Sequence, residues 1–255
     1  MIIEYQRPKT VHEALTLLAR EQPVSYPLAG GTVINSGMDE DIAVIDLQAL
    51  GLNSIKKEGS SLHVGATATL QALLEYQGLP EDLYRAIKLE ATYNLRQMAT
   101  IGGTLVCATG RSPLVSVLLA LNTGIEILSL GTKAEHIKLG DWLPLRDRSK
   151  SAKLITALDV PSNIKLAFEY IARSPADQPI VCAALGQWES GRTRLALGGW
   201  GAAPVLALDG PTGDGIEMAA QSAYSSAQDE WASAEYRQEM AAVLARRCLQ
   251  RMYPG

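Results

Sequence analysis

Hydrophobic residues recur at helical spacing in several segments of this 255-residue chain. Thr10 and Glu13 form a capping box before the first of these segments, so the pattern predicts a helix over about 11–21. The same spacing predicts helices over 70–76, 81–92, 114–121 and 229–252. Pro113 stands where a proline is tolerated, in the first turn of the fourth helix.

Short β-rich runs separate these helices and end at Gly, Asn or Asp. The predicted strands are 24–28, 41–47, 61–64, 180–187 and 193–197, with a hairpin formed by 124–129 and 134–137. The order lacks the regular strand–helix alternation of a Rossmann fold, which favours an α+β protein. A polar, proline-containing stretch within 142–161 predicts a domain boundary near 155–165.

Composition and charge exclude several classes of protein. The net charge is −4, the isoelectric point is near 5.5 and aromatic residues make up 5%, so we expect no nucleic acid partner. No run approaches 18 apolar residues, and the N-terminus resembles neither a signal nor a transit peptide. We therefore expect no membrane span and a cytoplasmic location.

Neither the cysteines nor the histidines have the spacing of a metal site. Cys107, Cys182 and Cys248 are far apart among apolar neighbours, which predicts reduced thiols in the core. His12, His63 and His136 are predicted to be satisfied or solvated side chains. With no hydrolase or kinase motif present, we expect no catalytic residue and no metal.

Two Gly-Gly-Thr sequences, within 29–32 and 101–104, are the strongest candidate site. A glycine pair can present successive backbone N–H groups, and the threonine adds a hydroxyl donor. Two such turns would bind one diphosphate from both sides. Either pair alone is also compatible with an ordinary tight turn.

The amino-acid sequences of several segments resemble those of the FAD-binding medium subunit of molybdenum hydroxylases. This is the family of the carbon monoxide dehydrogenase and xanthine dehydrogenase flavoprotein subunits. The segments are 26–32, 44–47, 64–70, 94–105, 112–121, 195–205 and 235–237, and they follow the family's order. The resemblance implies an FAD-binding domain over 1–160, with subdomains of about 1–57 and 58–160. A smaller α+β C-terminal domain over 161–255 would follow it.

By this resemblance, FAD lies between the two subdomains, with its diphosphate held by both glycine turns. The implied binding residues are Ala29, Gly30, Gly31, Thr32 and Val33 on one side, and Thr100, Ile101, Gly102, Gly103 and Thr104 on the other. Gly65 and Ala66 would pack beside them, although an ordinary turn at a strand end explains this pair equally well.

The resemblance also implies partners and a reaction. The cofactor carries the chemistry, so the absence of an acid–base pair is expected. A molybdopterin-binding large subunit would hydroxylate the substrate, and a small subunit with two [2Fe–2S] clusters would deliver electrons to the flavin. An acceptor such as NAD or a quinone would then receive them.

Three positions depart from the family at the flavin ring. Pro113 replaces an Asp, Tyr170 a Lys, and Gln178 an aromatic residue, so the sequence lacks a carboxylate, a charge and a stacking contact there. Two alternatives therefore stand beside an FAD-binding electron-transfer subunit. One is a flavin-free structural or assembly subunit, and the other a binding protein for a different diphosphate-containing ligand.

Overall fold

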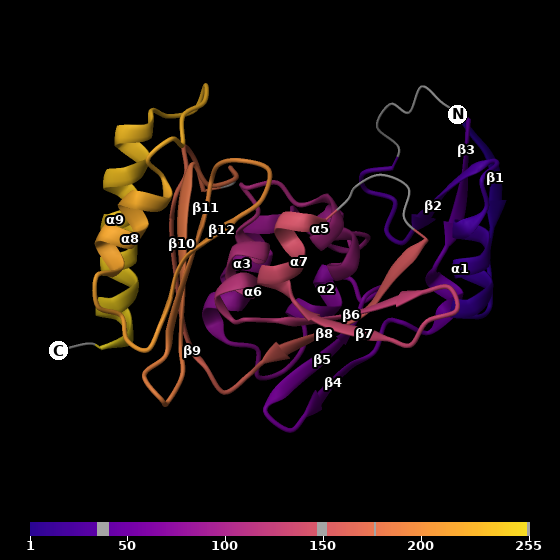
Figure 1. The fold of residues 1–255 in the computed structure, drawn as a ribbon, viewed down its shortest axis with the longest axis horizontal. Helices are drawn as coiled ribbons and strands as arrows, with labels where there is room; N and C mark the ends of the chain where they lie inside the picture. The colour runs from indigo at the N-terminus through magenta and orange to yellow at the C-terminus, as the bar shows by residue number, and fades with distance from the viewer. Residues whose placement is uncertain (35–40, 147–151, 176, 254–255) are drawn as a thin grey trace. The chain divides into compact units, whose positions relative to one another are not determined.

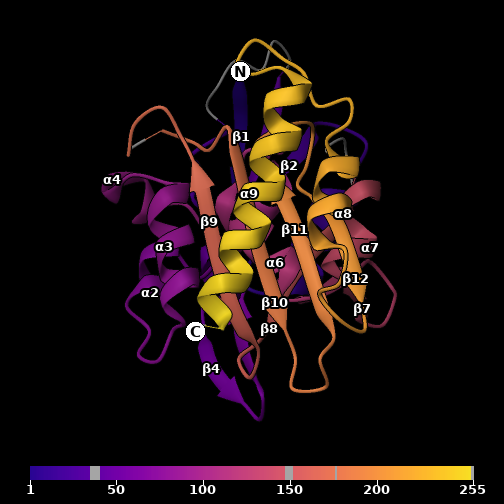
Figure 2. The same ribbon diagram turned by 90° about the vertical axis from the view of Figure 1, so that its left-hand side faces the viewer.

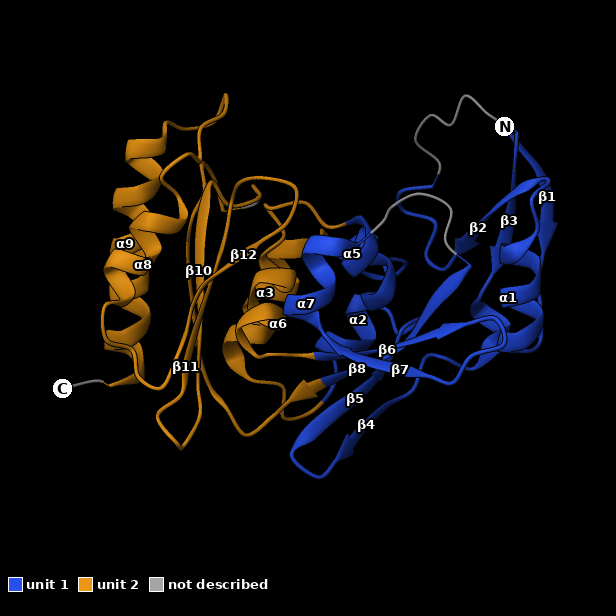
Figure 3. Cartoon of the chain, viewed as in Figure 1, with its two compact units in different colours: residues 1–76, 93–107, 124–159 blue, residues 77–92, 108–123, 160–255 orange. Residues whose placement is uncertain are grey.

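A computed structural model describes residues 1–34, 41–146, 152–175 and 177–253 (Figure 1). By the contacts between its residues the chain divides into two units, each made of three separate stretches (Figure 3). Unit 1 comprises 1–76, 93–107 and 124–159, and unit 2 comprises 77–92, 108–123 and 160–255. The chain thus enters unit 2 and returns to unit 1 twice. It enters unit 2 for the third time between Asp159 and Val160.

A parallel three-stranded sheet forms the N-terminal part of unit 1. Its strands are β1 (Ile2–Gln6), β3 (Ile42–Asp46) and β2 (Val24–Leu28), in that order across the sheet. Helix α1 (Val11–Ala19) packs Ala14, Leu15 and Leu18 against the sheet residue Ile45. Because all three strands run the same way, their carboxyl ends lie at one edge of the sheet.

A second sheet of five strands completes unit 1. Its order is β4 (Ile55–Glu58), β5 (Ser61–Gly65), β8 (Lys153–Pro161), β6 (Gly124–Ser129) and β7 (Glu135–Lys138). The accompanying helices are α2 (Leu70–Leu74), α4 (Tyr93–Arg96), α5 (Ile101–Cys107) and α7 (Leu139–Trp142), with short 3-10 turns at Gln48–Leu50 and Leu143–Leu145.

Unit 2 is a three-layer arrangement around an antiparallel sheet. The strand order is β12 (Val205–Gly210), β11 (Thr193–Gly198), β10 (Val181–Gln187) and β9 (Lys165–Ile171). Helices α8 (Ile216–Ala223) and α9 (Ala234–Met252) cover one face, and α3 (Glu81–Glu90) and α6 (Pro113–Ala120) lie on the other (Figures 1 and 2).

The residues of β10 show why both faces of this sheet are covered. Val181, Ala183 and Leu185 join the apolar cluster that includes α9, while the Sγ of Cys182 lies 3.6 Å from the Oγ of Ser116 in α6. Every residue of β10 is buried. Alternate side chains of a strand point to opposite faces, so a strand covered on both sides is apolar throughout.

Most predicted elements are present, and the α+β class is confirmed. The capping box is confirmed in part: the N–H of Glu13 donates to the Oγ1 of Thr10, but the Glu13 carboxylate accepts from the N–H of Lys9, one residue earlier than expected. The last helix begins at Ala234 rather than 229, because Ser233 caps it. No helix of the described residues is long and apolar enough to cross a membrane. The polar linker falls partly at 147–151, outside the described residues.

Candidate functional site

The first glycine pair follows β2 directly, at the carboxyl edge of the parallel sheet. Gly31 has φ +67°, a left-handed conformation that favours glycine. A Cβ at Gly30 would lie 1.9 Å from the carbonyl oxygen of Met98, so only glycine allows this approach. Within the described ranges, the N–H groups of Gly30, Gly31 and Thr32 donate to no other residue. Three successive donors are therefore available to a ligand.

Charged side chains lie at the same edge of the sheet. Asp46, at the end of β3, pairs with Leu28 across the sheet and accepts a hydrogen bond from the Tyr5 hydroxyl. That hydrogen bond raises the pKa of Tyr5 above its ordinary value. The Nε of Arg7 lies 3.4 Å from the same carboxylate. Asp46 is 4% exposed and also accepts from the N–H of Gln48, so its charge is compensated inside the protein.

The second glycine pair is not the turn that the sequence predicts, because it lies in the first turns of α5. The N–H groups of this segment are already bonded: Ile101 to the oxygen of Ala68, Gly102 to the oxygen of Ala66, and Gly103 to the Oγ1 of Thr100. The N–H and hydroxyl of Thr104 both bond the oxygen of Thr100. This pair therefore contributes close packing rather than free amide donors.

Gly102 is required by a close contact with Ala66. A Cβ at Gly102 would lie 2.9 Å from both the Cβ and the oxygen of Ala66. Glycine within a helix costs about 1 kcal/mol relative to alanine, and this packing explains why it is found here. Gly65 makes its own close approach, because a Cβ there would lie 2.3 Å from the oxygen of Leu52.

The structure thus brings all three predicted segments together in unit 1. Gly30 packs on the Met98–Ala99 peptide, two residues before Ile101, and Ala66 packs on Gly102. Ala29 lies against the apolar core around α1, while Val33 is 52% exposed beside the available amides. The assignment of the residues in these segments as FAD contacts stays a prediction. The structure does show that the three segments lie next to one another.

Sequence reasoning missed a buried cation beside these segments. Arg96, at the end of α4, is 8% exposed, and its Nε donates to the Oε1 of Gln71 over 3.3 Å. It stands five residues before Ile101. The only signal in the sequence is a charged residue next to a glycine motif, which gives no indication of burial.

The positions that depart from the family lie in unit 2. Pro113 is the first residue of α6, and Ser112 caps this helix. The Glu90 carboxylate of α3 accepts from the Ser112 hydroxyl over 2.7 Å and from the N–H of Leu114 over 2.9 Å. A carboxylate is therefore present at this helix terminus, supplied by another element.

The other two departures, Tyr170 and Gln178, make contacts within unit 2. The Tyr170 ring stacks on Phe168 with a centroid separation of 5.7 Å. The backbone oxygen of Gln178 accepts from Arg111 over 2.7 Å. The Tyr170 side chain therefore has a local packing role, whereas the contact of Gln178 is made by its backbone and does not explain its side chain.

The thiols and histidines fit the predictions with one exception. Cys182 and Cys248 are buried, and burial raises the pKa of Cys182 to about 12, but Cys107 at the end of α5 is exposed. Helix α5 is amphipathic, and Cys107 falls outside its buried side. The Nδ1 of His63 lies 2.9 Å from Asp159. In the part of the chain that the structure describes, no group of His, Cys, Asp or Glu is arranged to hold a metal ion.

Comparison with known proteins identifies the class to which this fold and site belong. The model of the family described as "FAD binding domain in molybdopterin dehydrogenase" matches residues 1–163, and the chain belongs to this family. Among curated proteins, YgfM of Escherichia coli K12 is 28% identical over 252 residues, spanning 96% of this chain and 94% of the relative.

Two further relatives carry names that describe a complex. The carbon monoxide dehydrogenase medium chain of Afipia carboxidovorans is 28% identical over 282 residues, covering 97% of this chain and 96% of its own length. The structure of reconstituted CO dehydrogenase from Oligotropha carboxidovorans has a chain with a TM-score of 0.83, 26% identity and coverage of 97% and 96%. The fold expected from the sequence resemblance is confirmed.

The cofactor of this family, FAD, fits the described residues. Its diphosphate needs several donors and close access to the backbone, and the cradle at Gly30 to Thr32 offers both. A Cβ at Gly30 would collide with the carbonyl oxygen of Met98, so glycine is required where this segment packs on the second one. The second pair fits less directly, since its amides are bonded internally.

Proposed function

We propose that this chain is the FAD-binding electron-transfer subunit of a molybdenum-dependent hydroxylase or dehydrogenase complex. In this role it passes electrons from iron–sulfur clusters on another subunit to an external acceptor. The observation that carries the proposal is the cradle at Gly30, Gly31 and Thr32, whose successive N–H groups have no partner among the described residues. FAD, when bound, supplies the redox chemistry.

The chain's own residues would bind and orient the cofactor. The N–H groups of Gly30, Gly31 and Thr32 would bind diphosphate oxygens, and Gly31 makes the required left-handed turn. Ala66 and Gly102 fix α5 against the strand end of β5. The buried Arg96 adds a positive charge to the segment that leads to α5, which favours an anionic ligand.

Partners follow from the same proposal. A molybdopterin-binding subunit and a [2Fe–2S] subunit would supply substrate oxidation and electrons, and NAD or a quinone would accept them. The isolated chain would then bind FAD but hydroxylate nothing.

The test is flavin content of the full chain. The purified protein, after incubation with FAD and removal of excess, should show the visible absorbance of a bound flavin at one FAD per chain. Gly30→Ala should lose it, because the new methyl group meets the Met98 carbonyl. Gly124→Ala is the matched control, since a Cβ there makes ordinary contact at 3.6 Å with Asp159.

A flavin-free assembly subunit is the second candidate, and the internally bonded amides of α5 favour it. It predicts a complex of normal composition and no FAD uptake by the chain alone or in the complex. Stoichiometric, reducible FAD in the complex would exclude this alternative. A binder of another diphosphate would be stabilised against heat by that ligand more than by FAD.

A further inference from the structure

Two arginine side chains lie over the ring of an exposed tryptophan in unit 2. The Cζ of Arg111 lies 4.4 Å from the ring centroid of Trp231, and the Cζ of Arg173 lies 4.5 Å from it. Trp231 is 37% exposed and Arg173 is also exposed. We call these three residues the Trp231 cluster. They come from three separate loops of unit 2, before α6, after β9 and before α9.

Hydrogen bonds to Asp229 and Arg237 fix the loop that contains Trp231. Asp229 accepts from the N–H of Trp231 over 2.8 Å and from the N–H of Ala232 over 3.2 Å. Arg237, which is 0% exposed, donates to both oxygens of the Asp229 carboxylate. The remaining donors of Arg237 bond the carbonyl oxygens of Ile180, Ala227 and Ala232.

Hydrogen bonds to the backbone also fix the Arg111 side chain. The Nε of Arg111 donates to the oxygen of Pro179 over 3.0 Å, and its Nη2 donates to the oxygen of Gln178. Such preorganisation lowers the entropy lost when a partner binds, because the contacting side chains are already ordered.

One arginine of the cluster, Arg173, is not paired with a carboxylate of the described residues. Arg173 makes no hydrogen bond or ion pair to any described residue. Burial lowers the pKa of Arg111, the carboxylates of Asp229 and Asp177 oppose this effect, and the charges of Arg237 and Arg173 add to it. The carboxylate of Asp229 is already bonded to Arg237. The guanidinium of Arg173 keeps its N–H edge available while it stacks on the ring, and that edge matches a carboxylate. The Nε and Nη2 of Arg111 are already bonded to backbone oxygens.

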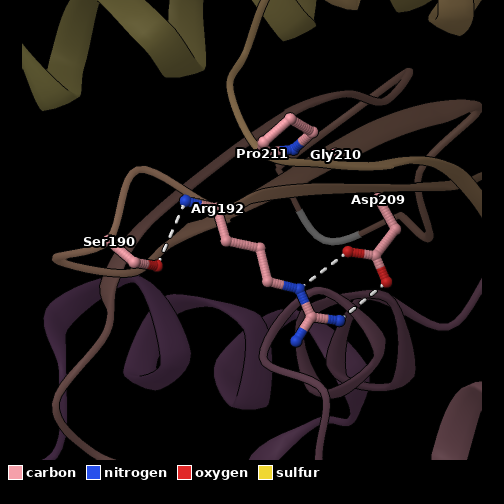
Figure 4. Close-up of a pocket in the computed structure, with 5 residues that line it drawn as sticks. All are labelled: Ser190, Arg192, Asp209, Gly210 and Pro211. Atoms are coloured by element: carbon pink, nitrogen blue, oxygen red, sulfur yellow. Dashed lines mark hydrogen bonds and ion pairs between the residues drawn. The ribbon is translucent and has the colours of Figure 1, made fainter.

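A second Arg–Trp pair in the same unit shows the contrast. Arg192 lies 5.1 Å from the ring centroid of Trp188, but its Nε and Nη2 donate to Asp209 over 2.9 and 2.8 Å (Figure 4). Hydrogen bonding from Arg192 lowers the pKa of Asp209, while burial opposes the effect. That arginine is already neutralised by the chain's own carboxylate, whereas Arg173 is not.

We propose that Arg111, Arg173 and Trp231 form a docking site for an acidic segment of a partner polypeptide, whose carboxylates pair with the guanidinium edge of Arg173 beside the Nη1 of Arg111. Tryptophan and arginine are the residues that most often dominate the binding energy of protein interfaces. Arg173 presents an exposed positive charge on a chain whose net charge is −4. The proposal does not use the backbone amides of Gly30 to Thr32, so peptide binding and flavin binding are measured separately and each can fail alone.

The experiment measures binding of a fluorescently labelled hexaglutamate peptide to the full chain by anisotropy at low salt, with a hexaglutamine peptide as the uncharged probe. Only the glutamate peptide should bind, and added salt should weaken it. Arg173→Ala should weaken binding about tenfold or more, since hydrogen bonds to charged groups dominate the contact. Trp231→Ala should also weaken it.

Arg192→Ala is the matched control and should leave peptide affinity unchanged. Arg173→Ala alters an exposed side chain, so its circular dichroism and melting temperature should match those of the unchanged protein. The proposal is overturned if the glutamate peptide does not bind, or if Arg192→Ala weakens binding as much as Arg173→Ala. It is also overturned if inorganic phosphate or ADP binds the cluster more tightly than the peptide, which would indicate a small-anion site.

Discussion

At the scale of single residues, the contact between Gly30 and the Met98 carbonyl is the tightest requirement of the candidate site. A Cβ 1.9 Å from an oxygen cannot be accommodated without moving the backbone of one segment. The sequence could predict that glycine is needed here, because a Gly-Gly-Thr motif follows a strand. It could not predict the neighbour, since residues 30 and 98 are brought together only by the fold.

The Gly30→Ala substitution should lower the free energy of unfolding by about 1–3 kcal/mol, as overpacking commonly does. Urea unfolding of the FAD-free chain would measure this. Gly124→Ala should change it little, because its new contacts are of ordinary length. Equal stability of the two variants would show that the Gly30 contact is not tight in solution.

A buried ion pair at Arg237 gives a second prediction at this scale. Arg237→Met leaves the Asp229 carboxylate without its cation and three carbonyl oxygens without their donor. Breaking such a pair from one side typically costs about 3–5 kcal/mol. Chemical denaturation should show this loss.

The control is Arg246→Met, which removes the ion pair between Arg246 and Glu217. Their side chains are 53% and 46% exposed, and exposed pairs contribute only about 0–1 kcal/mol. Comparable losses in the two variants would contradict the view that burial makes the Arg237 pair important.

At the scale of elements, helices α5 and α6 show what sequence patterns reveal and what they miss. The spacing of apolar residues and Pro113 predicts a helix over 114–121, and the structure has α6 at Pro113–Ala120 with Ser112 as a cap that the pattern does not identify. The pattern misses α5, because two adjacent glycines normally disfavour a helix. Contact with Ala66 overrides that preference, and no local signal in the sequence reports it.

The start of α6 also predicts a pH effect. Burial raises the pKa of Glu90, and the hydrogen bonds from Ser112 and Leu114 only partly oppose this. The folded protein therefore holds the proton more tightly than the unfolded chain does. Stability contributed by this group is present below the ordinary pKa of 4.5 and falls as pH rises towards the raised pKa.

Glu90→Gln should remove this loss of stability with rising pH, while keeping an acceptor oxygen for Ser112 and Leu114. The difference in unfolding free energy between the variant and the unchanged protein should shift in favour of the variant as pH rises through this interval. Denaturant unfolding at several pH values would measure it. A difference that does not vary with pH would show that Glu90 titrates normally.

At the scale of the whole molecule, ordered family landmarks predict the fold better than any local pattern. The resemblance carried by seven short segments predicts the fold class and the adjacency of residues near 30, 66 and 102. It does not predict the Trp231 cluster or Glu90, because these depend on contacts between segments far apart in sequence. Strand β1 was missed too, since its exposed and partly exposed residues show no buried side.

Binding of FAD should stabilise the entire chain by mass action. With free FAD at 100 times its dissociation constant, the gain is about 2.7 kcal/mol if only the folded chain binds. Differential scanning fluorimetry or calorimetry with FAD, NAD and ADP would measure it. A larger shift with NAD or ADP than with FAD would contradict the flavin assignment.

The assignment of α3 and α6 to unit 2 has a consequence for synthesis on the ribosome. All eight residues of α6 are buried, and the strands it packs against, β10 and β11, are made some 60 residues later. Until those strands emerge, Leu114, Val115, Leu118 and Leu119 have no sheet to cover them. The nascent chain therefore carries an apolar helix for several seconds at ordinary translation rates of about 5–20 residues per second. Chaperones that recognise exposed apolar segments would bind the nascent chain at α6, before β10 has been synthesised.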